Sequence, residues 1–277
     1  IKNSNKDIEI VGFHGQTIIH RPNEGYSLQM GDPNLLSLLL KKRVVFDFRK
    51  NDIKHKGEGA PLTPIYHFNL SKKLGLNYPI VFLNIGGISN FTYCENESFY
   101  AKDIGPGNVL IDNFIKKKTN FDFDKNGEIA ETGTVDINII NQFIEHQIYN
   151  SKNKHSYDIK DFDFNFVRGL SVEDAAATLT YFTAKIIANF IQNNFKNKIN
   201  IILCGGGRKN LTLQKNINDL VNHKVVNIDD LGIDGDYIES QAFAYLAIRS
   251  YLNKNLSFPT TTQVSKPVTG GQIFKNF

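Results

Sequence analysis

The stretch that most constrains the fold is residues 79–108, PIVFLNIGGISNFTYCENESFYAKDIGPGN, where short apolar runs alternate with glycine turns. Two strands are predicted on either side of Gly86 and Gly87, and a third strand ends at Asp103 before a glycine-proline turn. The paired glycines remove side chains where the backbone turns tightly or approaches another group closely. A doubled glycine between strands is also typical of a plain hairpin, so this turn alone leaves both interpretations open.

The polar residues of the same stretch make it a candidate site for phosphate chemistry. Asn84 and Asn90 flank the first glycine turn, and Asp103 stands at the mouth of the second. Backbone N–H groups exposed in a turn can hold anionic oxygen, and a carboxylate beside them can accept a proton. Phosphoryl transfer uses both. The alternative for Asp103 is a cap for the helix after Asn108, although Asn108 itself is better placed to cap it.

Composition excludes several classes of protein. The chain of 277 residues is 41% hydrophobic and 22% charged, which suits a globular protein of one or two domains. Cys94 and Cys204 lie far apart without metal-ligand spacing, which indicates a reducing compartment. The sequence shows neither a secretory leader nor an apolar run near ~18 residues, so we expect a cytoplasmic protein without a membrane partner. The net charge of +4 is scattered, which argues against nucleic-acid binding.

Strands alternate with helices along the rest of the chain, and this order predicts α/β layers, in two domains. Asp32 is expected to cap one helix, and Ser171 begins the clearest helix in the chain. Asp234 is expected to cap a further helix that carries Glu239. The glycine-rich residues 55–61, HKGEGAP, indicate a loop at a domain junction.

Other residues at the ends of predicted elements are candidates with structural alternatives. Gly205–Gly207 follow an apolar strand and either contact a nucleotide or only allow a close strand-to-helix turn. Glu239 either faces a pocket, as its apolar flank favours, or complements its helix dipole. Arg49 and Asp52 belong to a charge cluster at a strand end, where α/β sheets bind ligands. His14 is interpreted as a structural histidine.

Eight blocks, in order along nearly the whole chain, resemble the anhydro-N-acetylmuramic acid kinase family: GFHGQTIIHRP, SLQMGDPNLL, VVFDFRKND, GEGAPLTP, LNIGGISN, DIGPGN, LCGGGRKN and LGIDGDYIESQAFAYLA. The resemblance implies the two-domain actin-like ATPase and sugar kinase fold. Its first domain, residues 1–54 and 256–277, is incomplete, and its second, residues 55–255, carries the catalytic Asp and the adenosine loop. It also implies ATP with Mg²⁺, and conversion of 1,6-anhydro-N-acetylmuramic acid to N-acetylmuramic acid 6-phosphate in cell-wall recycling.

The resemblance further implies roles for individual residues. Asp103 matches the general base that activates the water attacking the anomeric carbon, while the released bridge oxygen takes the γ-phosphoryl group. Glu239 matches the acidic residue of the DGDxxE block near the sugar. The other matched residues are Thr17, Arg49 and Asp52 for the sugar pocket, and Asn84, Gly86, Gly87, Gly205, Gly206 and Gly207 for the nucleotide. The expected partner is a small amino sugar, and a homodimer is a possible assembly.

One part of the family pattern is missing from this sequence. Family members begin with a strand and a phosphate loop of the type SGTSxDG ahead of the GFHGQT block, whereas this sequence opens at Ile1 without it. We therefore expect weak ATP binding beside a retained sugar pocket. Three alternatives stay open: a catalytically inactive sugar-binding relative, a fragment that needs a separate N-terminal piece, and a glycoside hydrolase that uses Asp103 and Glu239 without ATP.

Overall fold

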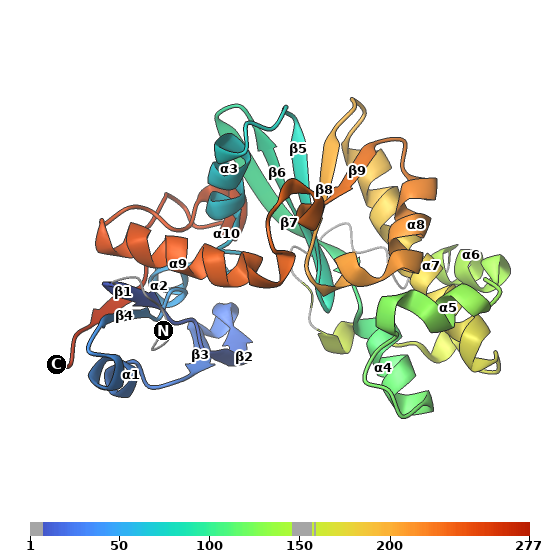
Figure 1. Ribbon diagram of the computed structural model, residues 1–277, viewed down its shortest axis with the longest axis horizontal. Coiled ribbons are helices and arrows are strands. Elements are labelled where there is room, and N and C mark those ends of the chain that lie inside the picture. Colours follow the sequence, from blue (N-terminus) through green and yellow to red (C-terminus); the bar gives the residue numbers. More distant parts are fainter. Residues whose placement is uncertain (1–7, 146–156, 158) are drawn as a thin grey trace. The chain divides into compact units, whose positions relative to one another are not determined.

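The chain forms two compact units in a computed structural model that describes residues 8–145, 157 and 159–277 (Figure 1). The described part of unit 1 comprises residues 8–76, 97–101 and 237–277, and that of unit 2 comprises residues 77–96 and the described residues within 102–236. Each unit combines β-sheet with helices, so the predicted α/β class is confirmed.

Unit 1 is built around a small sheet. Its elements are β1 (Ile10–Gly12), β2 (Gln16–Arg21), β3 (Tyr26–Met30), α1 (Pro33–Leu40), β4 (Arg43–Phe46), α2 (Lys50–Lys54), α3 (Pro64–Lys73), α9 (Ile238–Tyr251), α10 (Pro259–Thr262) and β10 (Gln272–Phe274). β4 lies between β1, to which it is parallel, and β10, to which it is antiparallel, while β2 and β3 form a separate antiparallel hairpin. Val44 and Val45 of β4 are completely buried, so this strand forms the centre of the unit.

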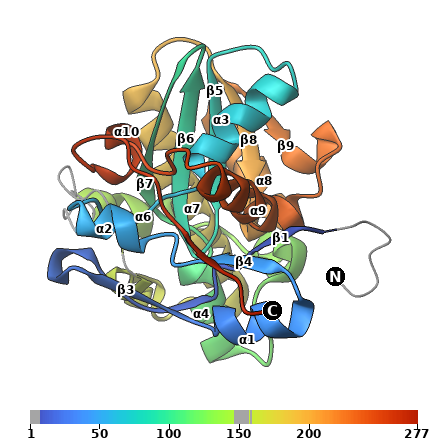
Figure 2. The same cartoon turned by 90° about the vertical axis from the view of Figure 1, so that its left-hand side faces the viewer.

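Helix α9 packs on this sheet and connects it to other segments of unit 1 (Figure 2). α9 contacts both β1 and α3. Gly12 of β1 permits the close approach, because a Cβ there would lie 2.4 Å from the carbonyl oxygen of Phe243. Through these contacts residues 55–76 and 237–255 belong to unit 1, whereas the sequence-based division had assigned them to the second domain. The glycine-rich residues 55–61 thus lie inside one unit and not at a junction.

Unit 2 contains the larger sheet. Its elements are β5 (Ile80–Ile85), β6 (Ile88–Glu95), β7 (Ser98–Pro106, of which residues 98–101 count with unit 1), α4 (Val109–Lys118), α5 (Glu128–Thr132), α6 (Ile137–Glu145), α7 (Val172–Asn194), β8 (Asn200–Cys204), α8 (Leu211–Leu220) and β9 (Lys224–Asn227). The strand order is β7-β6-β5-β8-β9. β5 is antiparallel to β6 and parallel to β8, and β8 is parallel to β9.

The 23-residue helix α7 joins two hydrophobic clusters of described residues in unit 2. Leu179 packs in a cluster with α4 and α5, and Ile187 packs in the cluster that includes the sheet and α8. Ser171 caps the helix as predicted, since its Oγ accepts from the N–H of Asp174 at 3.0 Å. The side-chain carboxylate of Asp174 accepts a hydrogen bond from the N–H of Thr134. None of the described helices, α7 included, is long and apolar enough to cross a membrane.

Two further predicted caps had different outcomes. Asp32 caps α1, because its Oδ1 accepts from the N–H of Leu35 at 3.0 Å. The helix expected from Gly235 to Leu252 begins as a 3₁₀ turn, Gly235–Tyr237, that leads directly into α9. Asp234 caps this turn, because its Oδ1 accepts from the N–H of Asp236 at 3.0 Å, and it does not cap α9 itself.

Candidate functional site

Three glycine-containing turns meet at one edge of the unit 2 sheet. β5 and β8 are parallel and in register up to Asn84, so the turns that follow them lie at the same edge. The turn after β7 joins this edge through the backbone. The N–H of Gly107 donates to the carbonyl oxygen of Gly87 at 2.9 Å, and the N–H of Asn108 donates to that of Gly86 at 2.7 Å. The predicted nucleotide-binding residues are therefore close together.

Two of these glycines are required by the packing of the chain itself. Gly205 has φ 78°, and a Cβ there would lie 2.5 Å from Oδ1 of Asn84 and 2.7 Å from the carbonyl oxygen of Ile85. A Cβ at Gly207 would lie 2.4 Å from Cγ2 of Ile85. Both distances are too short for a side-chain carbon. The close strand-to-helix turn that the sequence offered as an alternative is thus real at these two positions.

Gly86 and Gly206 differ from Gly205 and Gly207. A Cβ at Gly86 would meet its nearest atom, the carbonyl oxygen of Ile88, at 3.5 Å. A Cβ at Gly206 would meet the amide nitrogen of the Asn108 side chain at 3.7 Å. These are ordinary contact distances, so the packing of the chain does not demand glycine at either position. The close approach of another molecule is a second reason for glycine at such positions.

Asp103 lies on β7, two residues before Gly105. Its Oδ2 accepts a hydrogen bond from the backbone N–H of Tyr157 at 3.0 Å. Helix α4 begins after Asn108, whose side chain makes no capping hydrogen bond. The carboxylate of Asp103 thus binds the backbone of Tyr157. This contact differs from the cap of helix α4 that the sequence offered as the alternative for Asp103.

A second cluster, in unit 1, surrounds the guanidinium of Arg49. Arg49 Nε donates to Nε2 of His14 at 3.1 Å, and its Nη1 donates to the carbonyl oxygen of Gly59 at 2.8 Å. Burial lowers the pKa of Arg49 to about 10, against the opposing attraction of Glu239 and Asp52. Arg49 is still cationic near neutral pH. Three of the predicted residues, Arg49, Asp52 and Glu239, therefore share one electrostatic environment.

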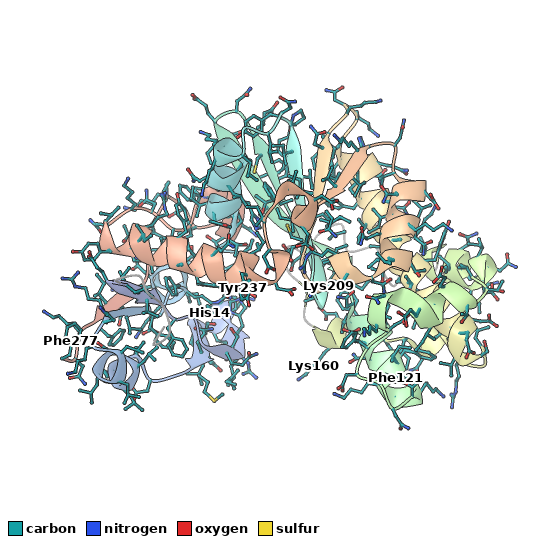
Figure 3. All side chains as sticks on the ribbon, in the orientation of Figure 1. His14, Phe121, Lys160, Lys209, Tyr237 and Phe277 are labelled. Atoms are coloured by element: carbon teal, nitrogen blue, oxygen red, sulfur yellow. The ribbon has the colours of Figure 1, made fainter. Side chains whose placement is uncertain are left out.

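His14, which the sequence suggested was structural and which is labelled in Figure 3, accepts a hydrogen bond that holds Arg49 in place. Its Nδ1 lies 2.8 Å from the carbonyl oxygen of Gly15, so Nδ1 carries the proton and Nε2 accepts from Arg49. Burial, followed by the charge of Arg49, lowers the pKa of His14 to about 4, which keeps the ring neutral. The ring also packs against Phe243, with centroids 4.3 Å apart. No local pattern signals this role, because His14 and Arg49 are 35 residues apart.

Asp52 and Thr17 have different surroundings within unit 1. Asp52 is 1% exposed; its Oδ1 accepts from the N–H of Gly59 at 2.6 Å and its Oδ2 from the hydroxyl of Thr262 at 2.6 Å. This burial favours a positioning role for Asp52 over direct contact with a sugar. Thr17 lies on the β2–β3 hairpin, where its hydroxyl accepts from the side chain of Gln29 at 3.2 Å.

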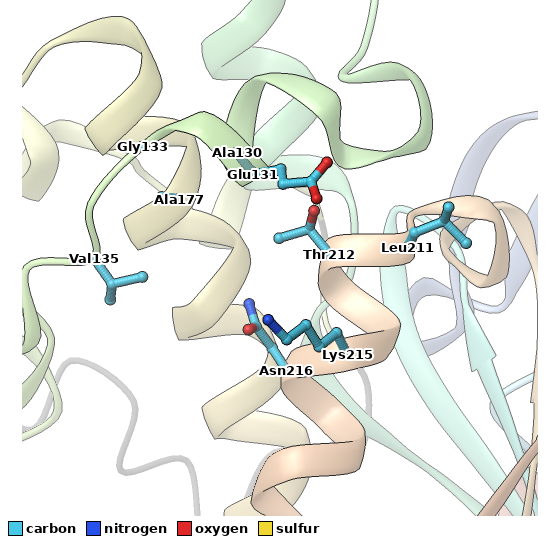
Figure 4. Close-up of a pocket in the computed structure, with 9 residues that line it drawn as sticks. All are labelled: Ala130, Glu131, Gly133, Val135, Ala177, Leu211, Thr212, Lys215 and Asn216. Carbon is cyan, nitrogen blue, oxygen red and sulfur yellow. The ribbon is translucent and has the colours of Figure 1, made fainter.

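Unit 2 also has a cavity of about 310 Å³ beside α5, α7 and α8 (Figure 4). Its lining residues are Ala130, Glu131, Gly133, Val135, Ala177, Leu211, Thr212, Lys215 and Asn216. None of the predicted site residues lines it, although Leu211 opens the helix that follows the Gly205–Gly207 turn. Within the described residues, no group of three or more His, Cys, Asp and Glu side chains is placed to hold a metal ion.

The sheets and glycine turns place the chain among α/β proteins with a candidate ligand site at the carboxyl ends of parallel strands. Comparison with known families gives the particular assignment. Residues 2–276 match the family described as anhydro-N-acetylmuramic acid kinase, and the chain belongs to this family of sugar kinases.

Similar proteins support this assignment. The chain is 49% identical to the anhydro-N-acetylmuramic acid kinase of Pelagibacter ubique, over 100% of this chain and 76% of the relative. It is 42% identical to that of Zymomonas mobilis, over 97% of this chain and 74% of the relative.

Two solved structures have a low likeness to this chain. An activator of 2-hydroxyisocaproyl-CoA dehydratase from Clostridium difficile with bound ADPNP has a TM-score of 0.40 at 16% identity, with 66% of each chain covered. Component A of the (R)-2-hydroxyglutaryl-CoA dehydratase of Acidaminococcus fermentans has a TM-score of 0.43 at 13% identity, with 76% of each chain covered. We draw no conclusion about ligands from either.

Proposed function

We propose that this chain converts 1,6-anhydro-N-acetylmuramic acid, ATP and water to N-acetylmuramic acid 6-phosphate and ADP, as a step in cell-wall recycling. The observation that carries the proposal is the extent of the family match, residues 2–276, which includes the glycine turns, Asp103 and the Arg49 cluster. We further propose a cytoplasmic location, with which the two buried free cysteines, Cys94 and Cys204, agree.

In this proposal Asp103 is the general base. Its carboxylate takes a proton from the water that attacks the anomeric carbon, and the bond from that carbon to the bridging oxygen breaks. The released oxygen then attacks the γ-phosphorus of ATP, and ADP leaves. The hydrogen bond from the Tyr157 N–H to Oδ2 orients the carboxylate for this proton transfer.

The nucleotide would contact the edge of the unit 2 sheet formed by Asn84, Gly86, Gly87 and Gly205–Gly207. Support comes from Gly86 and Gly206, where the packing of the chain itself does not demand glycine. Backbone N–H groups in such turns can hold phosphate oxygens. Mg²⁺ would enter with the nucleotide and offset the charge of its phosphates.

The sugar would contact the Arg49 cluster of unit 1, together with Thr17. Arg49 is a partly buried cation, and the substrate is a carboxylic acid, so a charge-assisted hydrogen bond between them is chemically suitable. His14 and Asp52 would orient this side of the site without touching the sugar. Glu239 would orient the sugar or the attacking water.

The test is product analysis after incubation with the anhydro-sugar, ATP and Mg²⁺. Mass spectrometry and phosphorus NMR should detect the 6-phosphate, and Asp103→Asn should slow its formation about a hundredfold or more. Reducing sugar without phosphate would instead indicate a glycoside hydrolase. Binding of the sugar by calorimetry without any product would indicate a catalytically inactive relative, or a fragment that needs a further piece.

A further inference from the structure

The arginine that follows the triple glycine is buried and fully engaged. Arg208 is 2% exposed, and its guanidinium donates to three acceptors. Nε donates to Asp229 Oδ2 at 2.9 Å, Nη2 to Asp236 Oδ1 at 2.9 Å and Nη1 to the carbonyl oxygen of Gly205 at 3.0 Å. One side chain thus connects the glycine turn to the segment 229–236.

Further contacts hold the segment 229–236 beside the Arg208 side chain. Asp229 also accepts from the N–H of Gly235 at 2.7 Å, through its other carboxylate oxygen. A Cβ at Gly235 would lie 2.1 Å from Nε of Arg208, which its three hydrogen bonds hold in place. Asp236 accepts a further bond from Nζ of Lys209, at 2.6 Å (Lys209 is labelled in Figure 3). Glycine at 235 is therefore needed for the arginine to reach both carboxylates.

Asp236 lies at the boundary between the two units, close to Glu239 in the sequence. Asp236 is the last residue of unit 2, and unit 1 resumes at Tyr237. Glu239, in the first turn of α9, follows three residues later. The side chain that fixes the carbonyl group of Gly205 therefore also holds the segment that leads to Glu239.

We propose that Arg208 is a positioning residue that couples the nucleotide turn to Glu239 through Asp236. This inference rests on the proposed function for the ligands at the two ends. The guanidinium keeps Gly205–Gly207 in the shape that receives the nucleotide and holds the segment 229–236 against this turn. Binding of nucleotide at the turn should then favour binding of the sugar, and the effect should be reciprocal.

Two variants test the inference. In Arg208→Lys a point charge replaces the planar fork and cannot serve all three acceptors at once. Asp236→Asn keeps the size of the side chain but removes its charge, and its site is 53% exposed, so the fold should tolerate it. The control is Lys116→Gln, which breaks an ion pair whose partners are 70% and 80% exposed.

Calorimetry should measure binding of a non-hydrolysable ATP analogue with Mg²⁺, and of the anhydro-sugar, each alone and in the presence of the other. Arg208→Lys should weaken nucleotide binding about tenfold or more and leave binding of the sugar alone within about twofold. Asp236→Asn should reduce the factor by which one ligand strengthens the other. Lys116→Gln should match the unaltered chain in all of these measurements.

Equal weakening of both ligands in step with a lower melting temperature would overturn the inference, since a merely structural role predicts that result. Unchanged nucleotide affinity in Arg208→Lys, or unchanged coupling in Asp236→Asn, would also overturn it. Failure of the proposed function is distinguishable, because the unaltered chain would then bind no nucleotide or form no phosphorylated sugar.

Discussion

Substitution of Gly205 by alanine should destabilise unit 2 through crowding of the backbone. At Gly205 the backbone has φ 78° and ψ 178°, a region that is essentially restricted to glycine. The new Cβ would meet two groups of β5, Asn84 Oδ1 at 2.5 Å and the carbonyl oxygen of Ile85 at 2.7 Å. The Asn84 side chain can rotate away. The Ile85 carbonyl belongs to a buried sheet strand and cannot move independently.

The magnitude follows from these two effects. A non-glycine residue in this region is strained by about 1–3 kcal/mol. Crowding against a fixed backbone atom adds about 1–3 kcal/mol, although relaxation of one effect relieves part of the other. We therefore expect Gly205→Ala to lower the free energy of unfolding by about 2–5 kcal/mol. The chain contains no tryptophan and 11 tyrosines, so urea unfolding is best followed by tyrosine fluorescence and circular dichroism.

Gly206→Ala is the matched control within the same turn. A Cβ at Gly206 has its nearest neighbour at 3.7 Å, and the residue is exposed. Its stability should stay within about 1 kcal/mol of the unaltered chain. If the nucleotide approaches this open backbone, however, the added methyl group should weaken binding of an ATP analogue. Equal stability of Gly205→Ala and Gly206→Ala would refute the crowding argument, and unchanged nucleotide affinity in Gly206→Ala would show that the open space serves another purpose.

Three further predictions concern ionisable groups. Asp103→Asn should keep sugar binding but lower kcat about a hundred- to ten-thousand-fold, or about 3–5 kcal/mol of barrier, in steady-state kinetics with phosphorylated product measured directly. A near-normal kcat for Asp103→Asn would exclude Asp103 as the base. Glu239→Gln should have a milder effect on kcat if Glu239 only orients the sugar or water. Burial, with the charge of Asp124 as second cause, raises the pKa of Asp112 to about 6. Asp112→Asn should therefore stabilise the protein by about 1–2 kcal/mol near pH 7, after allowance for the partial exposure of the carboxylate and for its favourable place at a helix N-terminus. This gain in stability should vanish as the pH falls through 6 towards 4, and equal gains in urea titrations at pH 7 and pH 4 would contradict the prediction. Burial lowers the pKa of His67 to about 4. The stability that the neutral ring contributes is therefore complete above the unfolded pKa of 6.5 and is lost as the pH falls from 6.5 to about 4. His67→Gln should flatten the dependence of stability on pH in this range, and an unchanged slope would contradict this prediction.

The sequence predicted best what depends on local pattern. Ile80–Leu83 is continuously apolar and lies in β5, the central strand of its sheet, and the glycine turns lie where the apolar runs stop. The start of α1 at Asp32 and that of α7 at Ser171 were also predicted, because a cap bonds to N–H groups two or three residues away. Such contacts are present in any short window of the sequence.

The domain division depended on contacts that no short window contains. The glycine-rich residues 55–61 suggested a junction, since glycine is common in linkers. In the structure the carboxylate of Asp52 binds both the N–H of Gly59 and the hydroxyl of Thr262, which is 210 residues away in sequence. These bonds fix the loop inside unit 1, and the glycines allow the chain to pass close to a buried carboxylate. A Cβ at Gly57, for example, would lie 2.2 Å from Asp52 Oδ1.

The triple glycine illustrates why the site was harder to predict than the fold. In the sequence Gly205, Gly206 and Gly207 are equivalent, and a nucleotide turn and a tight packing turn predict the same letters. The structure separates them: the neighbouring strand requires glycine at 205 and 207, whereas the chain leaves position 206 open. Glycine at 205 and 207 is therefore explained by packing alone, whereas glycine at 206 is better explained by a ligand. The same distinction applies to Gly86 in the first turn, so Gly86→Ala should resemble Gly206→Ala in keeping stability while losing affinity for the nucleotide.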